Sequence, residues 1–186
     1  AAAMNTAYAS NGITGLANEA ITLDDTSLAV ATLNTLDGNT TGAVNAATVT
    51  TLTGGAAAMN TAYASNGITG LANEAITLDD TTLAVATLNT LNGNTTGVVN
   101  AATVTTLTGA AAAMNTAYTA AGNSEISNLG NEAITLDDTS LAVATLNTLD
   151  GNTTGAVNAA TITTLTGAAA AMNTAYASNG ITGLAN

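Results

Sequence analysis

The amino-acid sequence predicts an α/β solenoid in which each circuit of 27–28 residues contributes one short strand and one short Ala-rich helix. Three observations lead to this fold class. The chain repeats itself with a long period, each period divides into two related halves, and each half carries a Thr-rich stretch followed by an Ala-rich stretch. Stacked circuits would place their strands in a parallel sheet along one face. An all-α hairpin solenoid, with the Thr-rich stretches as loops, is the alternative.

The long period is 55 residues. Residues 1–55 and 56–110 differ at only four positions, and the third period is three residues longer because residues 119–131 replace the equivalent of 64–73. Equivalent points are marked by four methionines: Met4, Met59, Met114 and Met172. We therefore expect one continuous repeat array over residues 1–186, an excerpt of a longer chain. Its expected units are 1–55, 56–110, 111–168 and a partial unit, 169–186.

An asparagine ends a Gly-x-x-Asn motif once in each half period. In the third period, where the loop is longer, the equivalent asparagine comes after the insertion. These asparagines recur every 27 or 28 residues, and once after 31. Stacked amides of this kind can bridge circuits and cover buried turn backbone. We therefore expect a structural column made of Asn18, Asn45, Asn73, Asn100, Asn131, Asn158 and Asn186.

The strands are predicted where threonine alternates with apolar residues, as in Ile21-Thr22-Leu23 and Thr48-Val49-Thr50. The apolar side chains would point inward and the threonines outward. A regular outward row of threonines could match an ordered lattice such as ice, but threonine is also an ordinary solvent-facing strand residue. We favour the ordinary role for the expected outward row: Thr22, Thr50, Thr77, Thr105, Thr135 and Thr163.

The first predicted helix covers residues 27–36, because Asp24-Asp25-Thr26 offers N-caps and acidic residues favour a helix start. Ala29, Leu33 and Leu36 would form its inward face. The second predicted helix covers residues 56–64, with Thr53 as a cap and with Met59 and Tyr63 one turn apart. Gly and Asn residues end both helices, since the sequence contains no proline.

The composition excludes several kinds of chemistry. Lys, Arg, His, Cys, Phe and Trp are all absent, and 12 Asp and Glu residues give a formal net charge of −12. Disulfides, Cys/His zinc sites and catalysis by thiol, histidine or lysine are therefore ruled out. With no side chain to neutralise phosphate, we expect no nucleic-acid partner, and no segment is apolar enough for membrane insertion. The acids recur in every unit with no unique residue among them, so we expect no enzyme.

The acidic residues raise the question of calcium, which binds carboxylate oxygens. One Glu and an Asp pair recur in each unit, but their spacing does not match the EF-hand pattern. Helix capping and solubility explain the same residues. No cofactor is expected, and the weak calcium candidates are Glu19, Asp24, Asp25, Glu74, Asp79, Asp80, Glu132, Asp137 and Asp138.

Three asparagines fit the N-glycosylation pattern N-x-[ST]. This short pattern is common, and each copy lies in a predicted turn between two elements. We therefore favour a structural turn role for Asn39, Asn94 and Asn152.

The sequence of the repeats resembles the tandem repeats of giant cell-surface and adhesin-like proteins of marine cyanobacteria, such as the giant surface proteins associated with swimming. The phrases that carry this resemblance are Gly12-Ile13-Thr14-Gly15-Leu16, Leu36-Asp37-Gly38-Asn39-Thr40-Thr41-Gly42 and Val49-Thr50-Thr51-Leu52-Thr53-Gly54. The resemblance covers essentially the whole chain and implies an acidic, secreted protein of the outer cell surface. It implies no active-site residues.

Together these observations predict a structural repeat segment of a large extracellular protein, either a spacer or part of a surface layer. The alternative is a calcium-dependent adhesion module. The expected partners are neighbouring repeats of the same chain, or other copies through end-to-end association, because a solenoid without polar caps leaves strand edges open.

Overall fold

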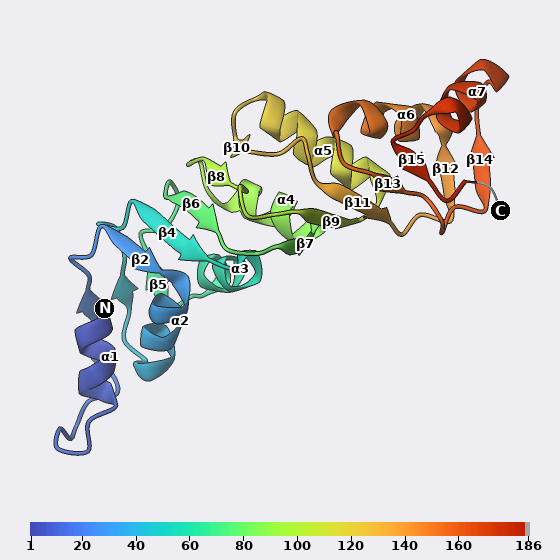
Figure 1. Cartoon of the computed structure of the whole chain (residues 1–186). Helices are drawn as coiled ribbons and strands as arrows, with labels where there is room; N and C mark the ends of the chain where they lie inside the picture. Colours follow the sequence, from blue (N-terminus) through green and yellow to red (C-terminus); the bar gives the residue numbers. More distant parts are fainter. Residues whose placement is uncertain (185–186) are drawn as a thin grey trace. The chain divides into compact units, whose positions relative to one another are not determined.

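The computed structural model describes residues 1–184 and has the predicted α/β architecture (Figure 1). Helices alternate along the chain with short strands, and these strands pair in parallel, which rules out the all-α alternative. The helices are α1 (Ala2–Tyr8), α2 (Val30–Asn39), α3 (Ala56–Ala64), α4 (Val85–Asn94), α5 (Ala111–Gly122), α6 (Val143–Asn152) and α7 (Ala169–Ala177).

The strand part of each circuit is divided into short pieces. The middle repeat unit, for example, carries five strands and two helices within residues 56–110. In chain order the strands are β1 (Ile21–Thr22), β2 (Ser27–Ala29), β3 (Val44–Asn45), β4 (Thr51–Gly54), β5 (Ile68–Thr69), β6 (Ala75–Leu78), β7 (Thr82–Ala84), β8 (Val99–Asn100), β9 (Thr106–Gly109), β10 (Ile126–Ser127), β11 (Ala133–Leu136), β12 (Ser140–Ala142), β13 (Val157–Asn158), β14 (Thr164–Thr166) and β15 (Ile181–Thr182).

The chain forms two compact units and passes from one to the other three times: after Asp79, within α4 after Asn89, and after Asn100. The first unit comprises Ala1–Asp79 and Thr90–Asn100, and the second comprises Asp80–Asn89 and Ala101–Asn186. In the first unit the parallel rows are β1-β3-β5 and β2-β4-β6-β8. In the second they are β7-β9-β11-β13-β15 and β12-β14. Each of these strands therefore pairs with the strand two places along the chain.

The register of these rows aligns the apolar residues of successive circuits. In the first unit Leu28 lies opposite Leu52, and Leu52 lies opposite Ile76. All three side chains are buried. A parallel ladder in this register places apolar side chains over apolar side chains, so each circuit covers the inner face of the one before it.

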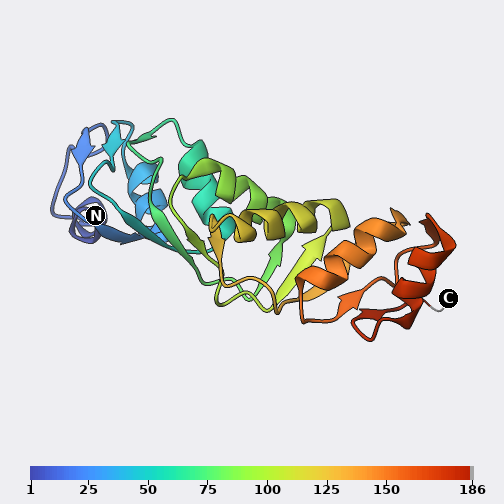
Figure 2. The same ribbon diagram turned by 90° about the horizontal axis from the view of Figure 1, so that it is seen from above.

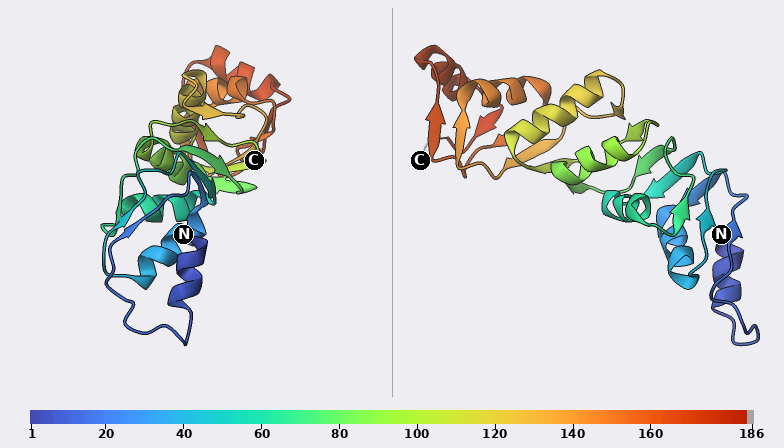
Figure 3. Two further views of the ribbon diagram at one scale, coloured as in Figure 1. Left: turned by 90° about the vertical axis from the view of Figure 1, so that its left-hand side faces the viewer. Right: turned by 180° about the vertical axis from the view of Figure 1, so that it is seen from behind.

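Helices in each unit follow one another along one side of the strands (Figures 2 and 3). In the first unit α1 packs on α2 and α2 on α3, and in the second α5 packs on α6 and α6 on α7. Leu33, Leu36 and Met59 have no exposed surface. Full burial of a side chain of this size contributes about 1.5–3 kcal/mol. The hydrophobic core is therefore thin, but every circuit contributes buried side chains to it.

Helix α3 spans the predicted residues, whereas the start of α2 was predicted wrongly. Residues 27–29 form β2, paired with β4, and α2 begins only at Val30 with Ala29 as an N-cap that makes no side-chain bond. The apolar Leu28 decides this, because an extended backbone buries it beside Leu52. The inward face of α2 consequently starts at Val30, and Ala29 is exposed.

The strand predicted at 48–50 also begins later than expected, at Thr51. The Val49 N–H donates back to the Ala46 carbonyl at 2.9 Å, which closes a tight turn and prevents an extended ladder there. The alternation of burial holds nonetheless, with Val49 buried between exposed Thr48 and Thr50. Thr53, the predicted cap of α3, lies in β4, and the N-cap of α3 is Gly55, which makes no side-chain cap bond.

Candidate functional site

The most regular polar feature is a Tyr–Glu clasp, in which a tyrosine at the end of a helix donates to a glutamate in the following circuit. Tyr63 Oη lies 2.7 Å from Glu74 Oε2, and Tyr118 Oη lies 3.0 Å from Glu132 Oε2. The N-terminal copy joins Tyr8 to Glu19 at 3.0 Å. Glu74 and Glu132 have no exposed surface. A buried carboxylate is tolerated only when it is hydrogen-bonded, so these clasps are structural requirements of the fold.

Backbone N–H groups complete each clasp. The N–H of Ala72 lies 3.1 Å from both carboxylate oxygens of Glu74, and the N–H of Gly130 lies 2.9 Å from Glu132 Oε2. Glu132 differs in one respect, because its buried Oε1 has no hydrogen-bond partner. This glutamate follows the three-residue insertion, which changes the loop that precedes the clasp.

A threonine and a glycine from the Asn-Thr-Thr-Gly phrase close the other side of the clasp. The Thr95 hydroxyl donates to the Glu74 carbonyl at 2.8 Å, and the Thr153 hydroxyl donates to the Glu132 carbonyl at 2.8 Å. Each hydroxyl also accepts the N–H of the glycine two residues later, at 3.0 Å. A Cβ at Gly97 or Gly155 would overlap the carbonyl group of the clasped glutamate. The Asn-Thr-Thr-Gly motif is therefore required for close contact between circuits.

The clasps shift the pKa values of their members. The pKa of the Glu19 carboxyl lies below its usual value, mainly because the carboxylate accepts hydrogen bonds from backbone N–H groups, that of Glu19 itself first. The hydrogen bond from the Tyr8 hydroxyl lowers this pKa further. Burial raises the pKa of Tyr118, and the negative charge of Glu132 raises it further. Burial also raises the pKa of Tyr63, and its bond to Glu74 contributes. The tyrosine of each clasp therefore keeps its proton more firmly than an exposed tyrosine and can donate it to the glutamate.

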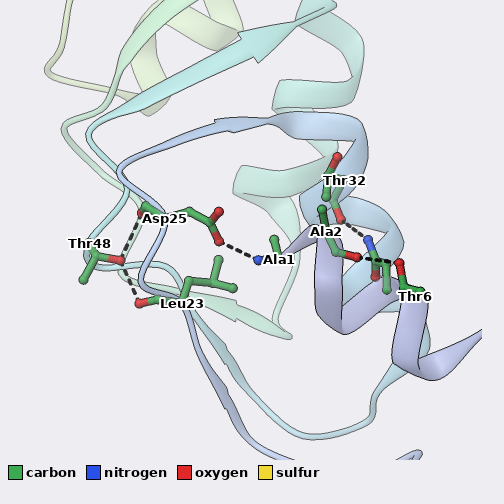
Figure 4. Close-up of polar contacts among 8 residues, drawn as sticks. Ala1, Ala2, Thr6, Leu23, Asp25, Thr32 and Thr48 are labelled. Atoms are coloured by element: carbon green, nitrogen blue, oxygen red, sulfur yellow. Dashed lines mark hydrogen bonds and ion pairs between the residues drawn. The ribbon is translucent and has the colours of Figure 1, made fainter.

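The Asp pairs cap helices, but not the helices predicted. Asp138 Oδ2 accepts the N–H of Ala111, at the start of α5 one circuit earlier, at 2.7 Å. Asp25 Oδ2 lies 2.6 Å from the Ala1 amino nitrogen, just before α1 (Figure 4). The first residue of each pair (Asp24, Asp79 and Asp137) is exposed. A carboxylate at a helix start is favourable, and here it also joins two circuits.

The calcium candidates are therefore divided among separate tasks. The glutamates are in the clasps, and Asp25 and Asp138 accept from helix starts. Within residues 1–184, no group of three or more Asp or Glu side chains is placed so that it could hold a metal ion. The sequence showed that these acids recur, but not that the glutamates and Asp138 accept backbone N–H groups.

In the predicted asparagine column, Asn45 and Asn158 make contacts within their own circuits instead of bridges between circuits. Asn45 and Asn158 accept the N–H of the residue two places later in their own turns, at 3.0 and 3.1 Å. Asn18, Asn73 and Asn131 are exposed, Asn100 is partly exposed, and Asn186 lies outside the described residues. Asn45 and Asn158 therefore shape turns of their own circuits.

A different set of asparagines, on the helices, makes the bridges, and we call it the helix asparagine ladder. The amide of each donates to a backbone carbonyl of the next helix. Asn34 reaches the Ala58 carbonyl at 2.9 Å, and Asn147 reaches the Ala171 carbonyl at 3.0 Å. The other contacts of this kind are Asn5 to Thr32, Asn89 to Ala113 and Asn115 to Thr145. The recurrence of Asn in the phrases Met-Asn-Thr and Leu-Asn-Thr could have revealed it.

Asparagines of the glycosylation pattern join this ladder. The Asn39 amide donates to Asn5 Oδ1 at 3.1 Å, Asn94 to Asn60 Oδ1 at 3.0 Å, and Asn152 to Asn115 Oδ1 at 2.9 Å. Each of these amide nitrogens already donates across two circuits, so a glycan there would have to fit beside that contact. The role is therefore structural, but these asparagines are the last residues of α2, α4 and α6 and do not lie in the predicted turns.

The outward threonines are all exposed, as the alternation predicted. Half of the row is also bonded to the preceding circuit. Thr50 donates to the Thr26 carbonyl at 3.0 Å, and Thr105 and Thr163 donate to the carbonyls of Thr81 and Thr139 at 3.1 Å. These hydroxyls therefore stabilise the stack as well as facing solvent.

One pair of positions changes together along the chain. The Ser65 hydroxyl donates to Asp37 Oδ2 at 2.7 Å, and the Ser178 hydroxyl donates to Asp150 Oδ2 at 2.7 Å. The intervening repeat has Asn92 in place of the aspartate, and the following helix, α5, carries Ala120 in place of the serine. The carboxylate is therefore present in the two repeats where a serine follows the next helix, and absent in the repeat where alanine takes the place of that serine.

Surface hollows recur in the same way as the contacts. An open groove of about 260 Å³ in the first unit is lined by small residues including Ala29, Gly54 and Ala58. Its equivalent in the second unit, of about 360 Å³, is lined by residues including Ala84, Gly109 and Ala113.

Among residues 1–184 no helix has the length and apolar character needed to span a membrane. Comparison with family models, with curated proteins and with solved structures gives no match for this chain.

Proposed function

We propose that this chain is a structural repeat segment, a spacer or part of a surface layer, of a large extracellular protein, and that it performs no catalysis. The supporting observation is that its recurring polar side chains are used for contacts between successive circuits. The buried glutamates take part in clasps, the helix asparagines bond to neighbouring helices, and the second Asp of a pair caps a helix of the previous circuit. A chain built in this way can be lengthened by whole units without new chemistry.

The extracellular location rests on composition and on the resemblance. With no Lys or Arg, the chain offers trypsin no cleavage site, which suits a protein exposed outside the cell. The resemblance to giant surface and adhesin-like repeats of marine cyanobacteria points to the same location. Partners of the segment are neighbouring repeats of its own kind.

Deletion of residues 56–110 in the producing cells tests the spacer role, because it joins Gly55 to Ala111 and preserves the repeat phase. We expect the protein to label intact, unpermeabilised cells, and the surface layer or stalk to become thinner in electron cryotomograms. The matched control is Gly151→Ala, which changes no unit number and lies at a helix glycine with open space around it.

Two results would contradict this proposal. One is a layer of unchanged thickness combined with the loss of calcium-dependent adhesion, which would favour the adhesion module. The other is labelling only after the cells have been permeabilised.

A further inference from the structure

The turn that follows α3 contains a chain of hydrogen bonds that begins on a backbone nitrogen. The N–H of Gly67 donates to the Ser65 hydroxyl oxygen at 3.0 Å, and the Ser65 hydroxyl donates to Asp37 Oδ2 at 2.7 Å. The Gly67 carbonyl accepts the N–H of Val44 at 2.8 Å, which holds the glycine against the preceding circuit. A hydroxyl and a carboxylate are thus aligned to take a proton from this one peptide nitrogen.

Glycine at position 67 lets the carboxylate approach the backbone. A Cβ there would overlap Asp37 Oδ1, so Asp37 packs directly against Gly67. Glycine also places no side chain beside its own nitrogen, which leaves that nitrogen open to react. An asparagine side chain can close a ring onto the backbone nitrogen that follows it, and Asn66, which precedes Gly67, is exposed to water. The turn therefore holds a reactive pair, Asn-Gly, beside a proton acceptor.

The turn that follows α7, in the second unit, has the same arrangement. The N–H of Gly180 donates to the Ser178 hydroxyl oxygen at 2.9 Å, and the Ser178 hydroxyl donates to Asp150 Oδ2 at 2.7 Å. The Gly180 carbonyl accepts the N–H of Val157 at 2.8 Å, and a Cβ on this glycine would overlap Asp150 Oδ1. Asn179, which precedes the glycine, is exposed. Two copies of one geometry therefore surround an Asn-Gly pair.

The repeat between these copies lacks every part of the arrangement. It carries Asn92 in place of the aspartate and Ala120 in place of the serine, and its loop over residues 119–131 contains no Asn-Gly pair. The Asn-Gly pair at Asn92-Gly93 lies within α4, where a backbone N–H is normally donated to the carbonyl four residues earlier. In the turns after α3, α5 and α7, the carboxylate, the hydroxyl and the Asn-Gly pair are thus present together or absent together.

We propose that Asn66 and Asn179 are sites of self-catalysed deamidation. The Gly67 nitrogen attacks Asn66 Cγ while its proton passes to Ser65 Oγ and the hydroxyl proton of Ser65 passes to Asp37 Oδ2. The new N–Cγ bond closes a succinimide, the Cγ–Nδ2 bond breaks, and the proton held by Asp37 returns through Ser65 to the leaving amine, which departs as ammonia. Water then opens the succinimide at either carbonyl and gives aspartate or isoaspartate.

Each deamidation adds a negative charge to a chain that already carries −12. The same steps apply at Asn179, with Gly180 as the nucleophile and Ser178 and Asp150 as the relay. Because the array is a repeat, the modification marks equivalent turns in both units. The proposal concerns the chemistry of these turns alone, and its failure would leave the spacer role untouched.

Mass spectrometry of the full-length chain after prolonged storage in neutral buffer tests this proposal. Cleavage after glutamate separates the sites, because residues 20–74 contain Asn66, residues 75–125 contain Asn92 and residues 133–186 contain Asn179. We expect Asn66 and Asn179 to convert at least about tenfold faster in the folded chain than in the same chain in urea, since a positioned proton acceptor acts only in the fold. Asn92 should convert more slowly in the folded chain.

Asp37→Asn and Ser65→Ala each remove one member of the relay in the first unit. Both introduce the residue that the middle repeat carries at the equivalent position, so the fold already accommodates them. Conversion of Asn66 should slow by at least about tenfold in either variant. Asn179 in the same molecules should keep its rate, because its own relay is unchanged, and circular dichroism should match that of the natural chain.

Asp24→Ala is the matched control for charge, because it removes an exposed carboxylate of the same unit. It should change neither rate. Unchanged or faster conversion of Asn66 in either relay variant would overturn the proposal, because it would show that the hydrogen bonds only hold or shield the turn. Slower conversion of Asn66 in the natural folded chain than in urea would overturn it as well.

Discussion

Gly155→Ala is expected to lower the free energy of unfolding by about 3 kcal/mol, the upper part of the usual range for overpacking. The new Cβ would overlap the carbonyl group of Glu132. That carbonyl is backbone and already accepts the Thr153 hydroxyl at 2.8 Å, so it cannot move without opening the clasp. Urea denaturation followed by circular dichroism measures the change.

Gly151→Ala is the matched control, because Gly151 lies four residues earlier, in α6, with open space around its Cα. Alanine there should leave stability unchanged or raise it by about 0.5–1 kcal/mol through its better helix propensity. Equal effects of the two substitutions would show that the close contact between circuits at Gly155 is not needed.

Alkaline titration is expected to unfold the chain steeply above about pH 10, the ordinary pKa of tyrosine. Tyr63 and Tyr118 have raised pKa values in the folded chain, chiefly because of burial. The unfolded chain loses these protons near pH 10 while the folded chain keeps them, so the stability present below pH 10 is lost as the pH rises. The free energy of unfolding should fall by about 1.4 kcal/mol per pH unit for each such tyrosine.

The composition makes this titration unusually simple to interpret. Lys, Arg and Cys are absent and the carboxylates are already ionised, so tyrosine is the side chain that titrates in this range. Tyrosinate absorbance and circular dichroism should change together in the natural chain. Tyr118→Phe should be less stable by about 1–3 kcal/mol at neutral pH, because Glu132 loses a donor, and its alkaline decline should be shallower. Ionisation of all tyrosines without loss of structure would contradict buried clasps.

The fold class could be predicted because repetition itself limits the possible architectures. The helix at 56–64 was confirmed at both ends, since Ala-rich sequence between Gly residues leaves few other starts. The start of α2 was wrong because Asp24, Asp25 and Thr26 looked like local caps, while Leu28 gains more by extending beside Leu52. The start of α2 was therefore decided by strand pairing with residues distant in sequence, and a local sequence pattern carries no information about that pairing.

The residues of the candidate site could be recognised in the sequence, but the contacts that they make could not. The recurrence of Tyr and Glu was visible, but a spacing of 11 residues, or 14 after the insertion, does not show that the two side chains meet. The loop between them must fold back first. The helix asparagines were equally visible and were passed over, whereas Asn45 was expected to bridge circuits and instead shapes its own turn. The paired change at Asn92 and Ala120 is visible in the sequence, but only the contact between the equivalent Asp37 and Ser65 explains it.

Small-angle scattering of a lengthened chain tests most directly whether successive circuits stack on one another. A second copy of residues 56–110 is inserted after Ala110, and the lengthened and natural chains are compared. The insertion adds two circuits, so we predict that the maximum dimension grows by about 10 Å if strand spacing sets the rise and about 20 Å if helix spacing does. A compact globule of the same sizes would gain only about 2 Å in radius of gyration. That smaller change, with no matching growth in length, would contradict the stacking of circuits.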